Sequence, residues 1–356
     1  MVNKRSNLMK ILCIMLSMML IAALSSCSGK AEEPEPEEPA ETEDFSVYGD
    51  ESLGIDATVD EALRDYRTIL IAGIDNHRQT DIQLVLSINK ETGEARMITI
   101  NRDTYMQISD GETIVTDERE VEFCKSNRAY EHGGKYALMK ELNRNLDLNI
   151  KEFIGVDWDC AAQLVDDLGG VEADIESQEM LDALNHLISV DSPSGTNLVS
   201  GTGKQTLSGW QAVQYLRVRK YKGGNAFVRD DHNRAFVETL LAKAKTMSIE
   251  DISEVYDDVA GKLDTNMSRN TLTETLAAIS DKEIENIGRF PYEFKTRYEP
   301  PDKHFNYRVA QSLVSNVVQL HADMFGQGEY TPTETVKGLS ERIIELEETY
   351  LIKREP

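Results

Sequence analysis

The sequence is poor in cysteine and histidine and lacks the motifs that these residues form in enzymes. It has four cysteines and six histidines in 356 residues, contains neither C-x-x-C nor H-E-x-x-H, and has no histidines at metal-ligand spacing. No G-x-G-x-x-G follows a predicted strand, and no G-x-S-x-G nucleophile elbow occurs. These absences argue against zinc enzymes, thiol redox proteins, dinucleotide-binding proteins and serine hydrolases.

Positive charge is scarce as well. The chain has 38 Lys and Arg against 63 Asp and Glu, which gives a formal net charge of −25 at pH 7. Nucleic acid is therefore excluded as an expected partner, because it binds basic surfaces. A hydrophobic content of 40% over this length is nevertheless typical of a folded protein with a substantial core.

The amino terminus has the pattern of an export signal. Lys4, Arg5 and Lys10 precede an apolar run over residues 11–24, and "LSSC" follows, ending at Cys27. This pattern resembles bacterial lipoproteins, which implies removal of residues 1–26 and a diacylglycerol on the cysteine. An uncleaved membrane anchor is the alternative, because the run is marginal for crossing a bilayer. Both alternatives place the rest of the chain at the outer face of the cytoplasmic membrane.

The next segment, residues 27–55, is predicted to be a disordered acidic linker. It contains "KAEEPEPEEPAETEDF", which is rich in Glu and Pro and nearly free of apolar residues. Such a segment cannot bury enough surface to fold, and its charges repel one another. Beyond it, Cys124 and Cys160 are the only cysteines left, and they are either paired as a disulfide or two separate buried thiols.

One strand and a hairpin follow the linker. "TILIAG" over residues 68–73 is a short run rich in β-branched residues that leads into the polar loop "IDNHRQTD". "IQLVLSI" (82–88) and "ARMITIN" (95–101), joined by "NKETGE", predict a hairpin. The ends of these strands carry five charged residues, which we take as site candidates: Asp75, Arg78, Asp81, Arg102 and Asp103.

The middle of the chain alternates helix and strand, as α/β domains do. "DCAAQLVDDLGG" (159–170) has an apolar helical face and ends in two glycines, and "VEADI" returns as a strand. Ser208 and Gln211 have capping-box spacing, which predicts a helix that ends near Arg217. "VRDDHNRAFVETLLAKAKTM" predicts an amphipathic helix with Arg229 at its start.

We assign residues 60–325 to one α/β domain and residues 326–356 to a carboxyl-terminal extension. The extension has Leu339, Ile343, Leu346 and Tyr350 along one stripe, which predicts an amphipathic packing helix. "SGTGKQT" before Ser208 looks like a phosphate-binding loop. The residues around Gly203 and Lys204 break that pattern, and we expect an ordinary loop there.

A basic cluster stands out in this acidic chain. "YLRVRKYKGGNAFVR" contains cations separated only by uncharged residues, and guanidinium groups fit phosphate oxygens in a bidentate manner. Ordinary surface salt bridges are the alternative. The members of the cluster are Arg217, Arg219, Lys220, Lys222 and Arg229.

An acidic pair lies earlier in the chain. Asp75 and Asp81 flank the loop after the first strand, and hard carboxylate oxygens are what Mg²⁺ prefers beside a substrate phosphate. Either residue alone would be explained by loop capping. Together with the basic cluster, the pair predicts a Mg²⁺-assisted site for a phosphate or pyrophosphate.

Several motifs in fixed order resemble the LytR-CpsA-Psr family of cell-wall glycopolymer ligases. They are "LIAGID" with "RQTD", "TINRDTYM", "GVDWDCAAQLVDDLGGVEADI", "GKQTLSGWQAVQYLRVRK" and "VRDDHNRAFVETL". The resemblance implies a single three-layer α-β-α domain with a central mixed sheet and a groove for a polyprenyl tail. It also implies transfer of a teichoic acid or a capsular or secondary polysaccharide from undecaprenyl pyrophosphate to peptidoglycan.

By position, the resemblance assigns roles to most of the candidates. It makes Asp75 and Asp81 the Mg²⁺-associated aspartates, and Arg102 and Asp103 the strand-end pair. The proton of the attacking hydroxyl could pass to Asp103 or to Asp75, and Asp103 could equally be a group that orients an arginine. Arg78, Arg102, Arg217, Arg219 and Arg229 are then the predicted pyrophosphate ligands.

The chain also departs from the family pattern. Gln79, Asn101, His232 and Asn233 stand where the family usually has other residues. Two further functions are therefore kept as alternatives, a pyrophosphatase that acts on prenyl pyrophosphates and a non-catalytic lipoprotein that binds prenyl-linked glycans.

Overall fold

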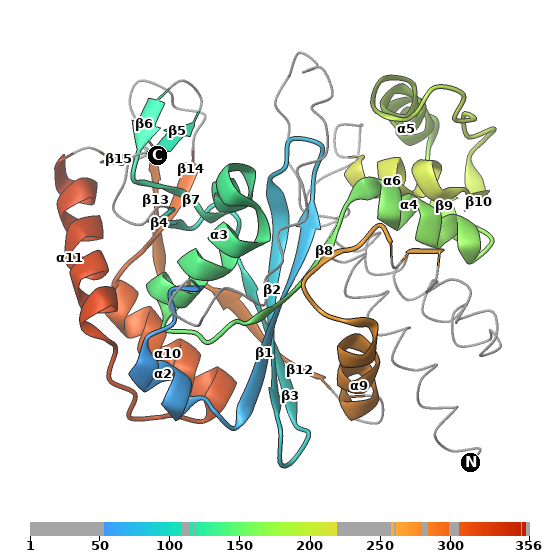
Figure 1. Cartoon of the computed structure of the whole chain (residues 1–356). Coiled ribbons are helices and arrows are strands. Elements are labelled where there is room, and N and C mark those ends of the chain that lie inside the picture. Colours follow the sequence, from blue (N-terminus) through green and yellow to red (C-terminus); the bar gives the residue numbers. More distant parts are fainter. Residues whose placement is uncertain are drawn as a thin grey trace, which may run out of the picture.

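A mixed β-sheet forms the centre of the molecule (Figure 1). The computed structural model describes residues 53–108, 114–116, 119–218, 258–259, 261–279, 284–298, 306–349 and 351–353. Within them the six-stranded sheet has the order β11-β8-β1-β2-β3-β12. Its strands are β1 (Tyr66–Ile74), β2 (Thr80–Asn89), β3 (Ala95–Ile100), β8 (Glu152–Val156), β11 (Asp264–Thr265) and β12 (Ile284–Phe290).

The strand directions bring four strand ends to one side of this sheet. β8 runs parallel to β1 and β12 runs parallel to β3, whereas β2 is antiparallel to both β1 and β3. The carboxyl ends of β1, β3, β8 and β12 therefore lie at the same edge, which we call the carboxyl edge. The predicted strand at 68–73 and the predicted hairpin are both confirmed, with β2 and β3 joined at Lys90–Glu94.

Both faces of the sheet are buried, because alternate residues of each strand point to opposite sides. Ile69 and Ile71 pack into one core cluster with α4, α5, α6 and α9, and Leu70 and Ala72 pack into the other with α2, α3, α10 and α11. The predicted three-layer α-β-α arrangement is thus confirmed (Figure 1). The helices are α2 (Ala57–Ala62), α3 (Ala129–Leu146), α4 (Trp158–Asp167), α5 (Gln178–Asp191), α6 (Gly209–Arg217), α9 (Arg269–Ile279), α10 (Leu313–Phe325) and α11 (Glu334–Thr349).

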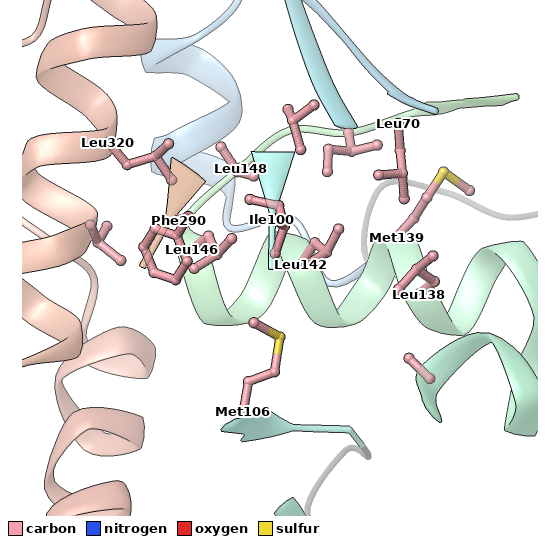
Figure 2. Close-up of a cluster of buried hydrophobic side chains, with 14 of the residues drawn as sticks. Leu70, Ile100, Met106, Leu138, Met139, Leu142, Leu146, Leu148, Phe290 and Leu320 are labelled. Atoms are coloured by element: carbon pink, nitrogen blue, oxygen red, sulfur yellow. The ribbon is translucent and has the colours of Figure 1, made fainter. Parts of the chain in front are cut away.

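Helix α3 provides one side of the second core cluster. Figure 2 shows Leu142 and Leu146 of this helix close to Ile100 of β3 and Phe290 of β12, with Leu138 one turn earlier along the helix. The three leucines are fully buried. Burying a leucine side chain contributes about 1.5–3 kcal/mol, so this contact fixes α3 against the sheet.

The remaining elements are short. They are β4 (Tyr105–Gln107), β5 (Ile114–Thr116), β6 (Arg119–Val121), β7 (Phe123–Lys125), a 3-10 turn at Ser126–Arg128, β9 (Val171–Ile175), β10 (Gly203–Leu207), β13 (Phe294–Tyr298), β14 (Asn306–Ala310) and β15 (Ile352–Lys353). The loop predicted around Gly203 and Lys204 was wrong: these residues begin β10, which pairs with β9 in an antiparallel ladder. That ladder satisfies the backbone groups that a loop would leave to solvent.

Helices α4 and α6 pack unusually closely. The side chain of Asp157 caps α4 by accepting a hydrogen bond from the Cys160 amide at 2.7 Å, and the predicted capping box of Ser208 and Gln211 starts α6. A Cβ on Gly209 would lie 2.0 Å from the Ala162 carbonyl oxygen. Only glycine allows this approach, which fixes where α6 ends and so where Arg217 lies.

Both ends of the described chain belong to the second core cluster. Leu53 and Ile55 are buried in it, so the folded part begins before the predicted end of the linker at residue 55. Helix α11 is the predicted packing helix, with Leu339 and Ile343 buried in the same cluster. Tyr350 lies outside the described residues, as does everything before residue 53.

Cys124 and Cys160 are not joined by a disulfide. Both thiols are buried, but Cys124 lies in the cluster of α3 and Cys160 in the cluster of α4, with the sheet between them. The disulfide alternative is therefore wrong, and the two-thiol alternative holds. None of the helices seen in the described segments combines the length and the apolar character that crossing a bilayer requires.

Candidate active site

The first candidate, Asp75, organises a tight loop at the carboxyl edge. It follows β1 directly, and its Oδ1 accepts hydrogen bonds from the backbone amides of His77 at 2.9 Å and Gln79 at 2.8 Å. The loop is closed by a backbone bond from the Asp75 amide to the Gln79 carbonyl at 2.9 Å. Arg78 takes the left-handed conformation that this turn needs, with φ of 56°. Asp75 is thus held rigidly at the start of the site.

Asp81 is placed by a β-bulge. Between β1 and β2 the register passes from Gly73 opposite Ile82 to Ile74 opposite Thr80, so Asp81 is the unpaired residue. Such bulges bend the strand and redirect a side chain. On the other side of β2, Gln83 lies opposite Ile100, and the same register continued by two residues places Asp81 opposite Arg102.

Asp81 and Arg102 form a buried ion pair. The Arg102 Nη1 atom contacts the Asp81 Oδ1 atom, and the two side chains are 16% and 2% exposed. The second carboxylate oxygen of Asp81 is buried and has no hydrogen-bond partner. A buried charge with an unused oxygen is costly, so this carboxylate has capacity for a further ligand.

The side chain of Asp103 is more exposed than that of Asp81 and has different neighbours. Its Oδ1 lies 2.8 Å from the Lys125 Nζ and 3.9 Å from the Arg102 Nε, and the side chain is 31% exposed. Its amide donates to the Asn101 side chain at 2.9 Å. Asp103 therefore contacts two cations of the site and holds Lys125, at the end of β7, beside Arg102.

Arg217 is the last residue of α6, where its guanidinium lies flat over an indole ring. The Cζ atom is 3.9 Å from the centroid of Trp158, and Nη1 lies 2.7 Å from the Gln214 Oε1 and 3.2 Å from the Asp191 Oδ2. Burial lowers the pKa of Arg217, and the charges of Asp191 and Asp75 oppose that shift. Trp158 lines the same cavity as Asp75, so α6 brings this arginine to the same edge of the sheet.

Arg78 and Gln79 link the Asp75 loop to α3 and to the turn before it. The Arg78 Cζ lies 5.7 Å from the centroid of Tyr130, a cation–π distance. Gln79 Oε1 accepts a hydrogen bond from the Asn127 side chain at 3.1 Å, while the Asn127 amide donates to the Arg102 carbonyl at 3.3 Å. Asn127 therefore ties the Asp75 loop to the segment that carries Arg102.

The oxygen atoms of this site fit a Mg²⁺ ion. Asp81 Oδ2 and Asn127 Oδ1 are buried without hydrogen-bond partners, and Asp75 is the other carboxylate of the loop. Mg²⁺ is commonly held by one or two carboxylates, with phosphate and water oxygens completing the shell. Across the described part of the chain, no group of three or more His, Cys, Asp or Glu residues could hold a metal by itself.

The structure thus brings together Asp75, Arg78, Asp81, Arg102, Asp103 and Arg217 at the carboxyl edge. Arg219, Lys220, Lys222 and Arg229 of the basic cluster lie outside the described residues, and so does Cys27. Sequence reasoning missed Lys125, Asn127, Tyr130 and Trp158. Only Trp158 had a usable signal, because it directly follows the helix cap Asp157 at the end of β8.

The described geometry can be compared with that of known proteins. The model of the LytR_cpsA_psr family matches residues 23–321. The chain belongs to this family. The motifs that suggested it, from the Asp75 loop to the helix ending at Arg217, are those that form the carboxyl edge.

Curated relatives in the LytR_cpsA_psr family are named as transferases. The polyisoprenyl-teichoic acid–peptidoglycan teichoic acid transferase TagU of Halalkalibacterium halodurans is 28% identical over 232 residues, covering 64% of this chain and 69% of the relative. TagU of Bacillus subtilis is 25% identical over 224 residues, covering 62% and 66%. The chain spans about two thirds of the length of these relatives.

A solved structure agrees with the fold. The crystal structure of protein gbs0355 from Streptococcus agalactiae superposes with a TM-score of 0.56 at 19% identity. The match covers 82% of this chain and 98% of that chain. The described fold is therefore that of a known family of structures.

Proposed function

We propose that this protein transfers a cell-wall glycopolymer from undecaprenyl pyrophosphate to peptidoglycan by Mg²⁺-assisted phosphoryl transfer. The polymer would be a teichoic acid or a capsular or other secondary polysaccharide. Family membership and the names of the relatives support the reaction class. The observation that carries the proposal is the convergence of Arg78, Arg102 and Arg217 on Asp75 and Asp81 at one edge of the sheet.

The arginines are assigned to the pyrophosphate of the donor. Guanidinium groups bind phosphate oxygens in a bidentate manner, and the ring contact of Arg217 with Trp158 fixes its plane. Arg219 and Arg229 are the further ligands predicted from the sequence. When bound, Mg²⁺ would neutralise charge on the phosphate oxygens, with Asp75 and Asp81 as its protein ligands.

The chemical step forms one phosphodiester bond and breaks one pyrophosphate bond. The acceptor sugar hydroxyl attacks the phosphorus next to the glycan, and polyprenyl phosphate leaves with the electron pair of the broken P–O bond. The arginines stabilise the charge that develops on the leaving phosphate. Such electrostatic stabilisation is a large part of catalysis when the protein forms no covalent intermediate.

The hydroxyl proton needs an acceptor, and two carboxylates were predicted for this role. Asp103 is bonded to Lys125 and lies near Arg102, which suits a residue that positions cations. Asp75 has one oxygen fixed by two backbone amides, while its Oδ2 accepts no hydrogen bond from a described residue. We therefore assign proton transfer to Asp75 and positioning to Asp103.

We further propose that the protein is a lipoprotein anchored through Cys27 at the outer face of the cell membrane. The charged, apolar and "LSSC" segments of residues 1–27 support this assignment. Intact-mass measurement on protein from membranes tests it. A diacylglycerol on Cys27 as the first residue is expected, and a chain that retains an unmodified Met1 would contradict the assignment.

Transfer is tested with purified protein, a prenyl-pyrophosphate-linked oligosaccharide, Mg²⁺ and an uncross-linked peptidoglycan oligomer. A new covalent glycan–peptidoglycan product is expected from the wild type. Lipid phosphate released without that product would mean a pyrophosphatase, and binding of the donor with no reaction would mean a non-catalytic lipoprotein. Arg217→Ala should lower the rate of product formation at least about 100-fold, as removal of one charge-stabilising donor does in other enzymes.

A further inference from the structure

A cavity of about 220 Å³ opens beside Asp75. Its wall comes from the loop after β1, from α3, from the loop after β8 and from the segment that contains β11. Four members of the described active site line it, Asp75, Arg78, Tyr130 and Trp158, whereas Asp81, Arg102 and Asp103 do not. The cavity therefore adjoins the proposed pyrophosphate site and shares Asp75 and Arg78 with it.

The charges in the cavity wall are opposite to those that bind the donor. Four carboxylates line it, against the two cations Arg78 and Lys262: Asp75, Asp157, Asp159 and Asp264. A pyrophosphate would be repelled by this excess of negative charge. Sugar hydroxyls, in contrast, donate hydrogen bonds to carboxylates, and Lys262, which has no part in the proposed pyrophosphate site, can donate to ring and carbonyl oxygens.

The four carboxylates do not make the cavity itself a metal site, although Asp75 borders the proposed Mg²⁺ site. They come from three separate segments, and no three acidic or histidine side chains in the described ranges are close enough to share one. The volume is also below the roughly 300–1,000 Å³ that is typical of pockets for drug-sized ligands. One sugar ring of a longer chain is a ligand of suitable size and chemistry.

Two contacts from α3 hold the Asp264 side chain in place in the cavity wall. Asp264 accepts a hydrogen bond from the Tyr130 hydroxyl at 2.6 Å and pairs with the Lys135 Nζ at 2.5 Å. Residues five apart lie about 140° apart around a regular helix, so an unbroken α3 could not aim both at one carboxylate. The non-helical backbone of Gly133 and Gly134 breaks the helix between them and allows it.

The other side of the cavity is held by α4 and β8. Lys262 donates a hydrogen bond to the Gln163 side chain of α4 at 2.8 Å, and Asp264 lies opposite Gly155 in the β11–β8 ladder. Asp159 lies in the first turn of α4 and is exposed. A site whose walls are fixed before binding loses little entropy when it takes up a ligand.

We propose that this cavity is the acceptor subsite and binds one sugar residue of the peptidoglycan glycan strand. The proposal rests on the proposed function. Hydroxyls of the sugar donate to Asp159 and Asp264, Lys262 donates to its oxygens, and the attacking hydroxyl lies beside Asp75. The anionic donor thus binds among the arginines on one side of Asp75, and the sugar of the acceptor binds among the carboxylates on the other side.

The test separates acceptor binding from donor binding. Asp159→Asn, Lys262→Met and Asp264→Asn are compared with the wild type for the KM of the peptidoglycan oligomer and for binding of a fluorescent prenyl pyrophosphate. We expect each change to raise the acceptor KM about 10-fold and to leave donor affinity within about twofold. Asp60→Asn and Lys204→Met are the matched controls, because these residues form ion pairs away from the carboxyl edge.

Calorimetric titration of the peptidoglycan oligomer into the protein measures acceptor binding directly. It therefore tests the subsite even if the wild-type protein shows no transfer activity. Loss of oligomer binding in Asp159→Asn and Lys262→Met, with unchanged melting temperatures, would then support the subsite independently of the reaction. Asp264→Asn also removes a contact to α3. If the Asp264→Asn protein is unstable for this reason, the result for Asp159→Asn decides the outcome. Lower donor affinity with normal oligomer binding, or no change in either, would overturn the proposal.

Discussion

Both ends of the central sheet carry charged side chains around a cavity, but only one has the features of an active site. At the amino ends of β1 and β8, a cavity of about 480 Å³ is lined by Arg64, Arg67, Lys90 and Lys151. There Arg67 binds Glu152 through two contacts of 2.6 Å, and Lys151 lies 3.0 Å from Asp60. Arg67 and Lys151 are therefore each paired with a carboxylate.

The carboxyl edge differs in burial and in unused bonding capacity. The Asp81–Arg102 pair is mostly buried and leaves one carboxylate oxygen without a hydrogen bond, and Asn127, whose amide donates to the Arg102 carbonyl, has an unsatisfied buried side-chain oxygen. Arg64 and Asp60 at the other end are more accessible to water. The number of charges is therefore a poor guide to function, whereas buried groups with unmet hydrogen-bonding capacity are a better one.

The largest expected effect on stability comes from breaking the buried pair. Arg102→Ala leaves the Asp81 carboxylate buried without its cation, which typically costs about 3–5 kcal/mol of unfolding free energy. Arg67→Ala at the opposite end should cost about 1 kcal/mol, because its pair is more exposed. Urea unfolding of both variants measures the difference. Equal losses would contradict the contrast between the two ends.

The next effect concerns how α6 delivers Arg217 to the carboxyl edge. Gly209→Ala places a methyl group against the Ala162 carbonyl, and overpacking of this kind costs about 1–3 kcal/mol. It should also weaken donor binding, since Arg217 is displaced from Trp158. Thermal unfolding and prenyl pyrophosphate binding are measured together, with Gly338→Ala in α11, where nothing lies near an added Cβ, as the control.

Glu141 tests whether an unpaired buried charge always marks function. Both of its carboxylate oxygens are buried without partners in α3, and burial raises the pKa of this carboxyl well above its usual value. The folded protein keeps a proton that the unfolded chain loses above about pH 4.3. Stability contributed by this group is therefore lost as the pH rises from that value towards the raised pKa.

Replacing Glu141 should accordingly help the fold. Glu141→Met is expected to raise the free energy of unfolding at pH 7 by about 1–3 kcal/mol, with transfer activity unchanged. Glu141→Gln should flatten the dependence of stability on pH, because it removes the titrating group. Unfolding curves between pH 4.5 and pH 8 provide the measurement. A destabilised Met variant would mean that the carboxylate has a partner that matters.

The smallest effect is expected at Asp103, whose role we assign to positioning. Asp103→Asn weakens the hold on Lys125 and should lower the transfer rate about 10-fold without moving the pH dependence of the rate. Asp75→Asn, which removes the assigned proton acceptor, should cost about 10²–10⁴-fold, the typical contribution of general acid–base catalysis. A shifted pH profile in Asp103→Asn would reverse the two assignments.

Much of the fold was predictable because its signals are local. The hairpin of β2 and β3, the capped start of α6 and the glycines after α4 each depend on residues within a few positions of one another. The strand at Gly203–Leu207 was missed because its exposed, polar residues have no apolar alternation. Only its pairing with β9 makes it a strand.

The site was predictable in part for the same reason. The pairing of Asp81 with Arg102 could have been deduced by counting along the predicted hairpin. Lys125, Asn127 and Asp264 could not, because they reach the site from short segments that pack there only in the folded chain. Long-range contacts of this kind leave no periodic trace in the sequence.

The core shared by the two ends of the described chain has a consequence for how the protein is made. Leu53 and Ile55 pack in the same cluster as Val336, Ile343 and Leu351. Nearly the whole of the described chain must therefore leave the ribosome before this cluster can close. Until then the face of the sheet that this cluster covers exposes apolar surface, so the growing chain should be prone to aggregate until the last described helix is available.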